Sequence, residues 1–158
     1  MRTSYIVVII ILVLLYIYGY YKYPKNIAML QTDISRVKAD ILLERQPVVF
    51  EDAPSLDTIQ KRLFRYSIVT KFSLKADVPL WSETKFKYTA IQVHEATEVM
   101  ICPPGRKLVN NAPAEDEKLI AVQCKKGNIL LIPFKWKYNA GISADCLGVH
   151  DIVTYLLP

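Results

Sequence analysis

"KKGNILLIPFKWKY", residues 125–138, is the stretch that decides the fold of this chain. Gly127 and Asn128 are residue types that favour a tight turn. The apolar run 129–132 that follows has the length and composition of a buried strand, and Pro133 ends it because proline cannot donate to a strand ladder. The stretch therefore predicts a turn, a buried strand and an aromatic edge.

Beyond the turn, apolar and basic side chains alternate. Because neighbouring strand residues point to opposite faces, Trp136 is predicted on the inner face, and Lys135 and Lys137 on the solvent face. Lysines beside a tryptophan also occur where nucleic-acid bases stack. The alternation places them opposite the tryptophan, so we expect a core face, a solvent face and no nucleic-acid partner. The predicted inner face consists of Leu130, Ile132, Phe134 and Trp136.

Five further segments have the same β-branched and aromatic character and are separated by polar loops. This many antiparallel strands in about 100 residues predicts a two-sheet sandwich or a small barrel. The loop 103–118 contains proline, glycine and the acidic run 115–117, so we expect it in solvent. The predicted strand segments are 66–74, 87–94, 97–104, 118–126, 128–136 and 151–158.

Upstream of these strands, residues 47–52, "PVVFED", predict a short strand. Residues 55–66 predict a helix that Ser55 caps, with Asp57 favourable in its first turn. The inner face of this helix is formed by Leu56, Ile59 and Leu63.

Residues 26–46 are amphipathic, and Thr32 or Asp33 is suited to cap a helix there. We therefore predict a juxtamembrane helix that either docks on the domain or lies along a membrane, with packing by its apolar face as the preferred reading. That face is formed by Ile34, Val37, Ile41 and Leu42.

The N-terminal segment explains much of the high hydrophobic content of 52%. From Thr3 to Tyr21 it holds no charged residue, and these 19 residues approach the roughly 20 that cross a hydrocarbon core. Tyrosines cluster beside Lys22 and Lys25, as at a membrane interface. A cleaved signal peptide and a buried core helix are the alternatives, and the aromatic exit without a small-residue cleavage site disfavours the first. The predicted anchor side chains include Tyr5, Ile9, Leu12, Leu15 and Tyr18.

The charge distribution agrees with an anchor followed by a domain. The net charge is +5, and residues 1–25 supply +3 of it without any acid, so the basic character is not a nucleic-acid footprint. Basic residues follow the apolar run more often than they precede it, which predicts a single-pass protein with its C-terminal domain on the cytoplasmic side. We expect an anchor at 1–25, the juxtamembrane helix at 26–46 and a β domain at 47–158.

Three cysteines, Cys102, Cys124 and Cys146, are evenly spread and form no CxxC pair. An odd number at this spacing predicts reduced thiols buried in strands and not a disulfide framework. Reduced thiols agree with a cytoplasmic domain.

"GNILLIPFKWKY" resembles the late-strand motif of the cupin-like and JmjC-like double-stranded β-helix oxygenases. In that motif a Gly-Asp turn precedes a buried strand, a proline, a tryptophan and a metal-binding histidine. Gly127, Pro133 and Trp136 match, and Asn128 stands where aspartate is usual. Two further motifs occur in family order, "RQPVVFED" at 45–52 and "IQVHEATEVMICPP" at 91–104, the latter with Gln92 and the double proline Pro103 and Pro104.

The resemblance covers residues 41–158 and implies a mainly β fold: a small cupin-like antiparallel β-barrel or jelly roll with one or two short helices, preceded here by a single N-terminal transmembrane helix. Family members bind iron through a His-x-Asp/Glu pair and a distal histidine, and hold 2-oxoglutarate with a lysine. Those positions fall on Ser82 and Thr84, on Tyr138, and near Thr97. None keeps the catalytic residue type, so the resemblance implies no metal, no cofactor and no enzyme activity.

The chain has only two histidines, His94 and His150. Each stands next to an acid, and adjacent strand residues point to opposite faces, so neither makes a ligand pair. A ferrous site built from both histidines with Glu83 or Glu98 would need coincidence. The chain also lacks a GxSxG motif, a glycine-rich phosphate loop and an HExxH motif.

Two functions are therefore weighed. The first is a membrane-anchored, non-catalytic cupin-like structural or interaction protein, whose partners are a lipid bilayer and a capsid or membrane-protein assembly. Its small size and degenerate motif are similar to small cupin-like proteins of giant DNA viruses, which implies a minor capsid component that links an internal virion membrane to the capsid. The second is a cupin-type enzyme or small-ligand-binding module with a non-standard site. It needs a cluster of inward polar residues, which the sequence does not display.

Overall fold

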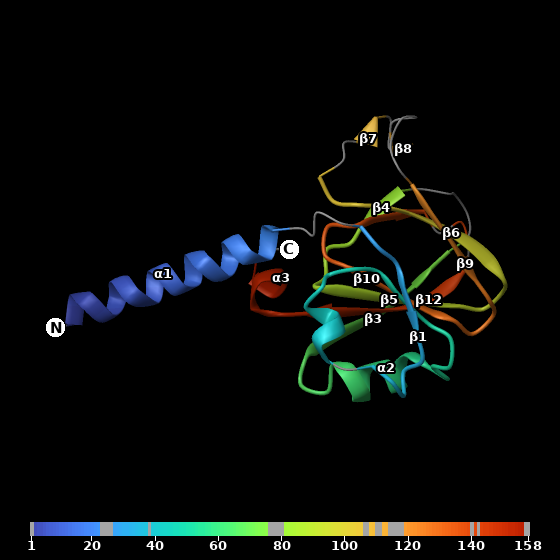
Figure 1. Ribbon diagram of the computed structural model, residues 1–158, viewed down its shortest axis with the longest axis horizontal. Coiled ribbons are helices and arrows are strands. Elements are labelled where there is room, and N and C mark those ends of the chain that lie inside the picture. Colours follow the sequence, from blue (N-terminus) through green and yellow to red (C-terminus); the bar gives the residue numbers. More distant parts are fainter. Residues whose placement is uncertain are drawn as a thin grey trace.

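The computed structural model describes residues 2–22, 27–37, 39–75, 81–105, 108–109, 112–113, 119–139, 141 and 143–156. A long helix, α1 (Arg2–Tyr21), extends from a domain built of two β-sheets (Figure 1). The predicted mainly β class is confirmed.

The larger sheet has six strands, and all of its pairings are antiparallel except β1 with β2. In spatial order its strands are β1 (Leu30–Thr32), β2 (Val48–Phe50), β10 (Ile129–Pro133), β5 (Tyr88–Val93), β12 (Ala144–His150) and β3 (Ile68–Leu74). The smaller sheet is antiparallel and has the order β4 (Trp81–Glu83), β11 (Lys137–Asn139), β6 (Thr97–Cys102) and β9 (Ile120–Cys124). A two-stranded ribbon, β7 (Leu108–Val109) with β8 (Ala112–Pro113), lies in the loop after β6.

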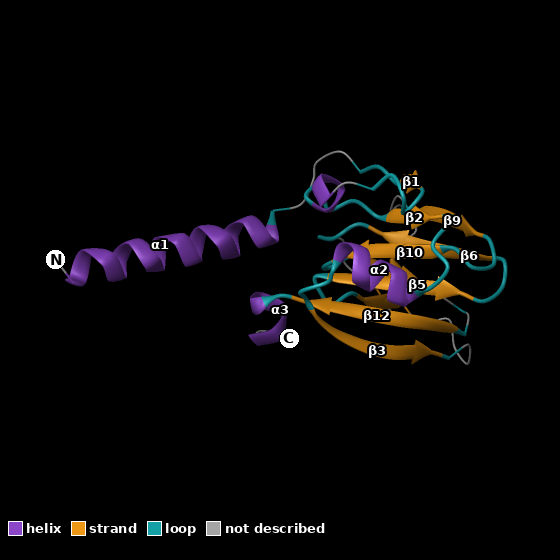
Figure 2. Cartoon of the chain, turned by 90° about the horizontal axis from the view of Figure 1, so that it is seen from below, coloured by secondary structure: helices purple, strands orange, loops and turns teal. Residues whose placement is uncertain are grey.

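The main core lies between the two sheets. Leu130 and Ile132 of β10 pack there with Ile101 of β6 and with Trp136, which is 1% exposed. The opposite face of the larger sheet is also covered, because α2 (Leu56–Leu63) and the chain before β2 pack on it (Figure 2). Since β10 is buried on both faces, every one of its five residues is buried, which explains its continuous apolar run.

Two turns carry the chain between the sheets. At the first, Gly127 has φ +86°, a conformation that glycine adopts without strain, and Asn128 accepts a hydrogen bond from the Lys125 amide at 2.5 Å. At the second, between Pro133 and Trp136, the chain leaves the larger sheet and Lys135 has φ +66°. These two turns enclose the stretch that decided the fold.

Helix α2 forms as predicted. Ser55 caps it by accepting a hydrogen bond from the Thr58 amide, and Asp57 lies in its first turn. Leu56 and Ile59 are buried against the larger sheet, and Leu63 packs at their edge.

The helix predicted for residues 26–46 is wrong. Leu30–Thr32 instead forms β1, because its backbone pairs in parallel with the free edge of β2. The Ile34 amide then donates to Asp52 at 2.5 Å, and a short 3-10 helix, η1 (Ala39–Leu42), follows. The apolar residues that predicted one helical face reach the same core from two places. Ile34 and Val37 lie in the turn and loop after β1, and Ile41 and Leu42 lie in η1.

The strand predicted for residues 151–158 is also wrong. The last strand among the described residues is β12, and the chain continues into a short helix, α3 (Ile152–Leu156). Asp151 caps this helix by accepting a hydrogen bond from the Thr154 amide at 3.0 Å, while the Asp151 amide donates to Thr154 Oγ1 at 3.0 Å. This reciprocal cap overrides the strand preference of the β-branched residues.

One lysine departs from the predicted solvent face. Lys137 is 7% exposed, because it lies on an interior strand with Glu83 and Cys102 directly across from it on either side. Lys135 is half-exposed and pairs with Glu83 at 2.8 Å. Phe134, predicted on the inner face, lies in the turn and is half-buried.

Candidate functional site

Ser82 and Tyr138, two positions that the cupin resemblance assigns to metal ligands, lie directly opposite each other. The antiparallel register of β11 and β4 pairs them. Thr84 follows two residues after Ser82, where it is 2% exposed. The three positions are therefore neighbours, and the chemistry of the site depends on their side chains.

Tyr138 is held as a neutral phenol. Its side chain is buried in the core between the sheets and is 6% exposed. Burial and the nearby Cys146 raise its pKa to about 12, against the opposing effect of a hydrogen bond with Ser82. A phenol with so high a pKa gives up its proton far less readily than an ordinary tyrosine, so it is a poor ligand for a ferrous ion.

Thr84 is engaged with the second turn. Its hydroxyl lies 2.6 Å from the Pro133 carbonyl oxygen, to which it donates, and 3.0 Å from that of Trp136. Its amide donates to the Trp136 carbonyl at 2.8 Å, and its carbonyl accepts from the Lys135 amide at 3.0 Å. Thr84 therefore fixes the turn in which Lys135 has a positive φ, and its hydroxyl serves that contact.

The remaining positions of the resemblance are spread over the β domain. Thr97 is half-buried on β6, opposite Cys124. The Gln92 side chain donates to the Pro54 carbonyl at 3.4 Å. Pro103 is buried and Pro104 half-buried, just after β6.

The three residues that match the late-strand motif all serve the fold. Gly127 forms the first turn, Pro133 is the buried last residue of β10, and Trp136 packs in the core between the sheets.

The two histidines lie at opposite ends of one strand pair. His94 follows β5 at the end where Ala144 begins β12, and His150 ends β12. Six strand residues separate these ends, which is about 20 Å. His150 Nε2 lies 3.1 Å from Thr70 Oγ1, and the His150 and Phe86 rings meet edge to face with their centres 4.8 Å apart. The two histidines therefore do not converge on one ion.

A group of polar side chains surrounds Asp145, near the start of β12 and at the opposite end of that strand from His150. Ser73 donates to one carboxylate oxygen and His94 Nε2 lies beside the other, both at 3.1 Å. In a serine hydrolase the histidine must accept the serine proton, and here the carboxylate stands between them. His94 and Asp145 are also more than half exposed. This arrangement is a solvated surface network and not a nucleophilic relay.

The three cysteines are buried and free, as predicted. Burial raises the pKa of Cys124 to about 11 and that of Cys146 to about 12. Because the thiolate is the reactive form, neither residue is a nucleophile near neutral pH. Within the described part of the chain, no three His, Cys, Asp or Glu side chains are grouped so that they could hold a metal ion.

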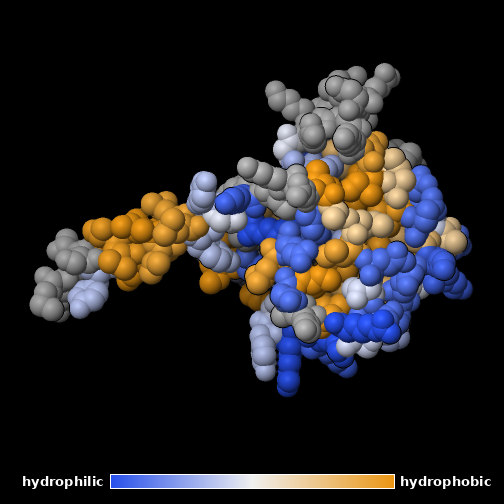
Figure 3. Space-filling model, in the orientation of Figure 1, coloured by the Kyte–Doolittle hydropathy of each residue, from blue (hydrophilic) through white to orange (hydrophobic). Residues whose placement is uncertain are grey.

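Most of the exposed large hydrophobic side chains among the described residues belong to α1. Tyr5, Ile9, Leu12, Leu15 and Tyr18 are between 59% and 70% exposed, and the helix stands clear of the domain along most of its length (Figure 3). Over the described residues, no helix is both long and apolar enough to cross a membrane.

The end of α1 is attached to α3. The Tyr16 hydroxyl donates to Asp151 Oδ2 at 3.0 Å, and Lys87 Nζ lies 3.7 Å from the same oxygen. Burial alone would raise the pKa of Asp151, but hydrogen bonds from Thr154 and Tyr16, with the charge of Lys87, hold it below its ordinary value. The carboxylate is therefore ionised near neutral pH, and it caps α3 and binds α1 together.

An apolar groove of about 500 Å³ lies between the two helices. Its walls include Ile9, Leu12 and Ile17 from α1, and Ile152 and Val153 from α3. An adjoining hollow of about 460 Å³ is lined by both apolar and polar side chains, including Tyr66, Ile68 and Tyr155. This junction was missed from the sequence, although Asp151 and Thr154 at cap spacing were a local signal for α3.

No family model, curated protein or solved structure matches this chain.

Proposed function

We propose that this chain is a membrane-anchored, non-catalytic structural or interaction protein, in which α1 is inserted in a bilayer and holds the β domain at its surface. The exposed apolar surface of α1 is the observation that carries the proposal. Burying one Ile, Val or Leu side chain contributes about 1.5–3 kcal/mol, and α1 presents a continuous series of them to solvent. A contiguous apolar surface of this kind marks a membrane or partner interface.

The proposed anchor is the whole uncharged segment from Thr3 to Tyr21, which extends beyond residues 5–19, the part of α1 whose side chains the structure describes. At 1.5 Å per residue its 19 residues extend for about 28 Å, close to the roughly 30 Å of a hydrocarbon core. Tyr18 lies near the end that leads into the domain, where tyrosines suit a membrane interface, and Lys22 follows. The bias of basic residues toward this end supports a domain on the cytoplasmic side.

The non-catalytic part of the proposal rests on what the hydroxyl groups do. Ser82 and Tyr138 bind each other, and Thr84 fixes a turn, so all three side chains already serve the fold. The pairing of Tyr138 with Ser82 also supports the further proposal that the two sheets form a cupin-like barrel, because that fold brings its ligand positions together.

The resemblance to small cupin-like proteins of giant DNA viruses motivates one more proposal. In it the bilayer is the internal membrane of a virion, and the β domain contacts a capsid protein. The resemblance in size and sequence motif alone supports this step.

Alkaline extraction of membranes from cells that express the full chain tests the anchor. We expect the wild-type chain to stay with the membrane pellet. Leu12→Arg places a charge near the helix centre at a cost of about 2.5–3.5 kcal/mol, so a substantial fraction should be released. Ala121→Arg, on an exposed position of β9, is the matched control and should stay in the pellet. Release of the wild-type chain would contradict the proposal.

A further inference from the structure

We propose that α3 and the side chains beside it form a second lipid-contacting surface, which lays the β domain against the same bilayer that holds α1. This inference rests on the proposed anchor and adds an orientation to it. The surface, called here the α3 platform, consists of Tyr66, Ile68, Ile152 and Tyr155.

The α3 platform gathers most of the exposed apolar surface outside α1. Among the described residues, seven large hydrophobic side chains beyond α1 are exposed, and four of them line the hollow at the foot of that helix. Their exposed fractions are 90% for Tyr66, 56% for Ile68, 75% for Ile152 and 59% for Tyr155. Scattered exposed hydrophobic residues need no explanation, but this cluster lies where the anchor meets the domain.

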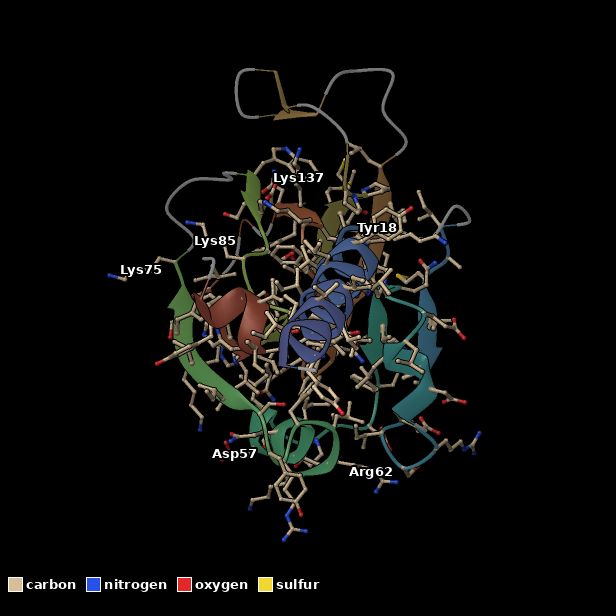
Figure 4. All side chains as sticks on the ribbon, turned by 90° about the vertical axis from the view of Figure 1, so that its left-hand side faces the viewer. Tyr18, Asp57, Arg62, Lys75, Lys85 and Lys137 are labelled. Atoms are coloured by element: carbon tan, nitrogen blue, oxygen red, sulfur yellow. The ribbon has the colours of Figure 1, made fainter. Side chains whose placement is uncertain are left out.

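The platform is continuous with the surface of α1. Tyr16 lines both the apolar groove and the adjoining hollow, and Ile152 does the same from α3. In Figure 3 orange areas lie on α1 and on the domain near α3, with paler atoms between them. Figure 4, viewed from the free end of α1, shows α3 beside the helix. The labelled Asp57, Arg62, Lys75 and Lys85 lie toward the outer edge of the β domain in this view.

The attachment point sets the depth of α3. Asp151 binds Tyr16, which lies five residues before the end of α1 at Tyr21. At 1.5 Å per residue this is about 7.5 Å along the helix axis, so α3 lies below the level of the helix end once the uncharged segment is inserted. Interfacial helices bury their apolar faces about 5–10 Å into the boundary between headgroups and acyl chains. The geometry therefore places the platform at that boundary.

The residues around the platform suit a bilayer with anionic lipids. Arg65 lies over the Tyr66 ring, with Cζ 5.4 Å from its centre. Lys87 stands beside Asp151, and Arg45 donates to the Lys22 carbonyl at 3.4 Å at the end of α1. Tyrosine, arginine and lysine side chains gathered together are typical of membrane interfaces.

Site-specific fluorescence on the full chain in vesicles tests the platform. The native cysteines are buried, so a thiol-reactive fluorophore will label a single added cysteine. The labelled variants are Tyr155→Cys and Ile68→Cys, with Ala121→Cys on β9 as the matched control. The vesicles contain phosphatidylcholine and phosphatidylserine, and flotation of each labelled chain with them reports the anchor separately.

At positions 155 and 68 we expect a several-fold loss of quenching by aqueous iodide relative to position 121, and strong quenching by lipids that carry a nitroxide near the headgroup. Adding Ile152→Glu, which suits the first turn of α3, should restore iodide quenching at 155, whereas Ala121→Glu should not. Floating chains with equal iodide quenching at 155 and 121 would overturn the platform and leave the anchor intact. Shielding from iodide without nitroxide quenching would identify a protein on this surface, including a second copy, and would also overturn it. A chain that does not float overturns both proposals.

Discussion

The Tyr16 hydroxyl of α1 donates a hydrogen bond to Asp151, the residue that caps α3, although Asp151 lies 135 positions later in the chain. The first and the last helix of the described chain are therefore connected through one carboxylate. That carboxylate also accepts from the Thr154 amide and lies near Lys87. The hydrogen bond from Tyr16 is one of the contacts that join α1 to the β domain, together with the hydrogen bond from Arg45 to the Lys22 carbonyl.

Replacing Asp151 by alanine should fray α3 and loosen its contact with α1. Loss of an N-cap aspartate costs about 1 kcal/mol, and the Tyr16 hydroxyl loses its acceptor at the same time. Hydrogen exchange at the Thr154 and Tyr155 amides measures the fraying. Asp151→Asn keeps a capping oxygen and should lie between alanine and the wild type. Equal protection in all three chains would show that the carboxylate does not hold the helix.

The same residue predicts a pH dependence. Because the pKa of Asp151 is below its ordinary value of 3.8 in the folded state, the ionised form stabilises the fold. That contribution is fully present above the ordinary pKa and is lost as the pH falls through the lowered one. The difference in Tm between the wild-type chain and Asp151→Asn should be constant above about pH 5 and should close in more acidic solution. A difference that widens on acidification would contradict the sign.

Thr84→Val should destabilise the β domain by about 1–3 kcal/mol, because it removes the hydroxyl that donates to the buried Pro133 carbonyl. Thr84→Ser keeps the hydroxyl and is the matched control. Chemical denaturation of both variants gives the comparison. If valine is tolerated as well as serine, the hydroxyl is not required by the turn, and the structural account of this position fails.

Trp136→Ala should lower the free energy of unfolding by about 3–5 kcal/mol, because the side chain is 1% exposed in the core between the sheets. Its Nε1 has no hydrogen-bond partner among the described residues, so Trp136→Phe breaks no hydrogen bond there and should destabilise the fold much less than Trp136→Ala. The same alanine substitution at half-buried Trp81 is a control for removing a tryptophan. Thermal melting ranks the three variants. A Trp136→Ala chain that melts with the parent would move this residue from the core to a partner-binding surface.

The elements that were predicted correctly depend on local signals. Helix α2 has its cap at Ser55, its acid at Asp57 and an apolar face at helical spacing, all within a few residues. The buried strand β10 is bounded by Gly127 and Pro133, whose backbone constraints act on the chain whatever surrounds it.

The elements that were predicted wrongly depend on distant partners. Residues 30–32 form a strand because β2 offers its edge, and no pattern within 26–46 shows that. Strand β12 was missed because Gly148 interrupts its pattern. A Cβ atom at position 148 would lie 2.6 Å from the Phe86 ring, so the fold requires glycine there. Because Phe86 stands 62 positions earlier in the chain, the sequence around Gly148 does not reveal this requirement.

The candidate site divides in the same way. Ser82 and Tyr138 were singled out by a resemblance, and the strand register that pairs them was found only in the structure. The junction of Tyr16 with Asp151 could not be predicted, because neither residue carries a local sign of the other. The platform beside it depends on the same long-range contact, together with a helix that the sequence presented as a strand.

Depth profiling along α1 tests the central claim most directly. Spin labels at single cysteines replacing Ile6, Ile9, Leu12, Leu15 and Tyr18 of the full chain in vesicles report relative access to oxygen and to a water-soluble nickel complex. An inserted anchor predicts that the ratio of oxygen to nickel access rises from residue 6 to a maximum near residues 9–12 and falls again toward residue 18. A ratio that oscillates with the helical period at constant mean depth would place α1 flat on the surface. A uniformly low ratio would place it in water, and either result would contradict the account of this chain as a membrane-anchored protein.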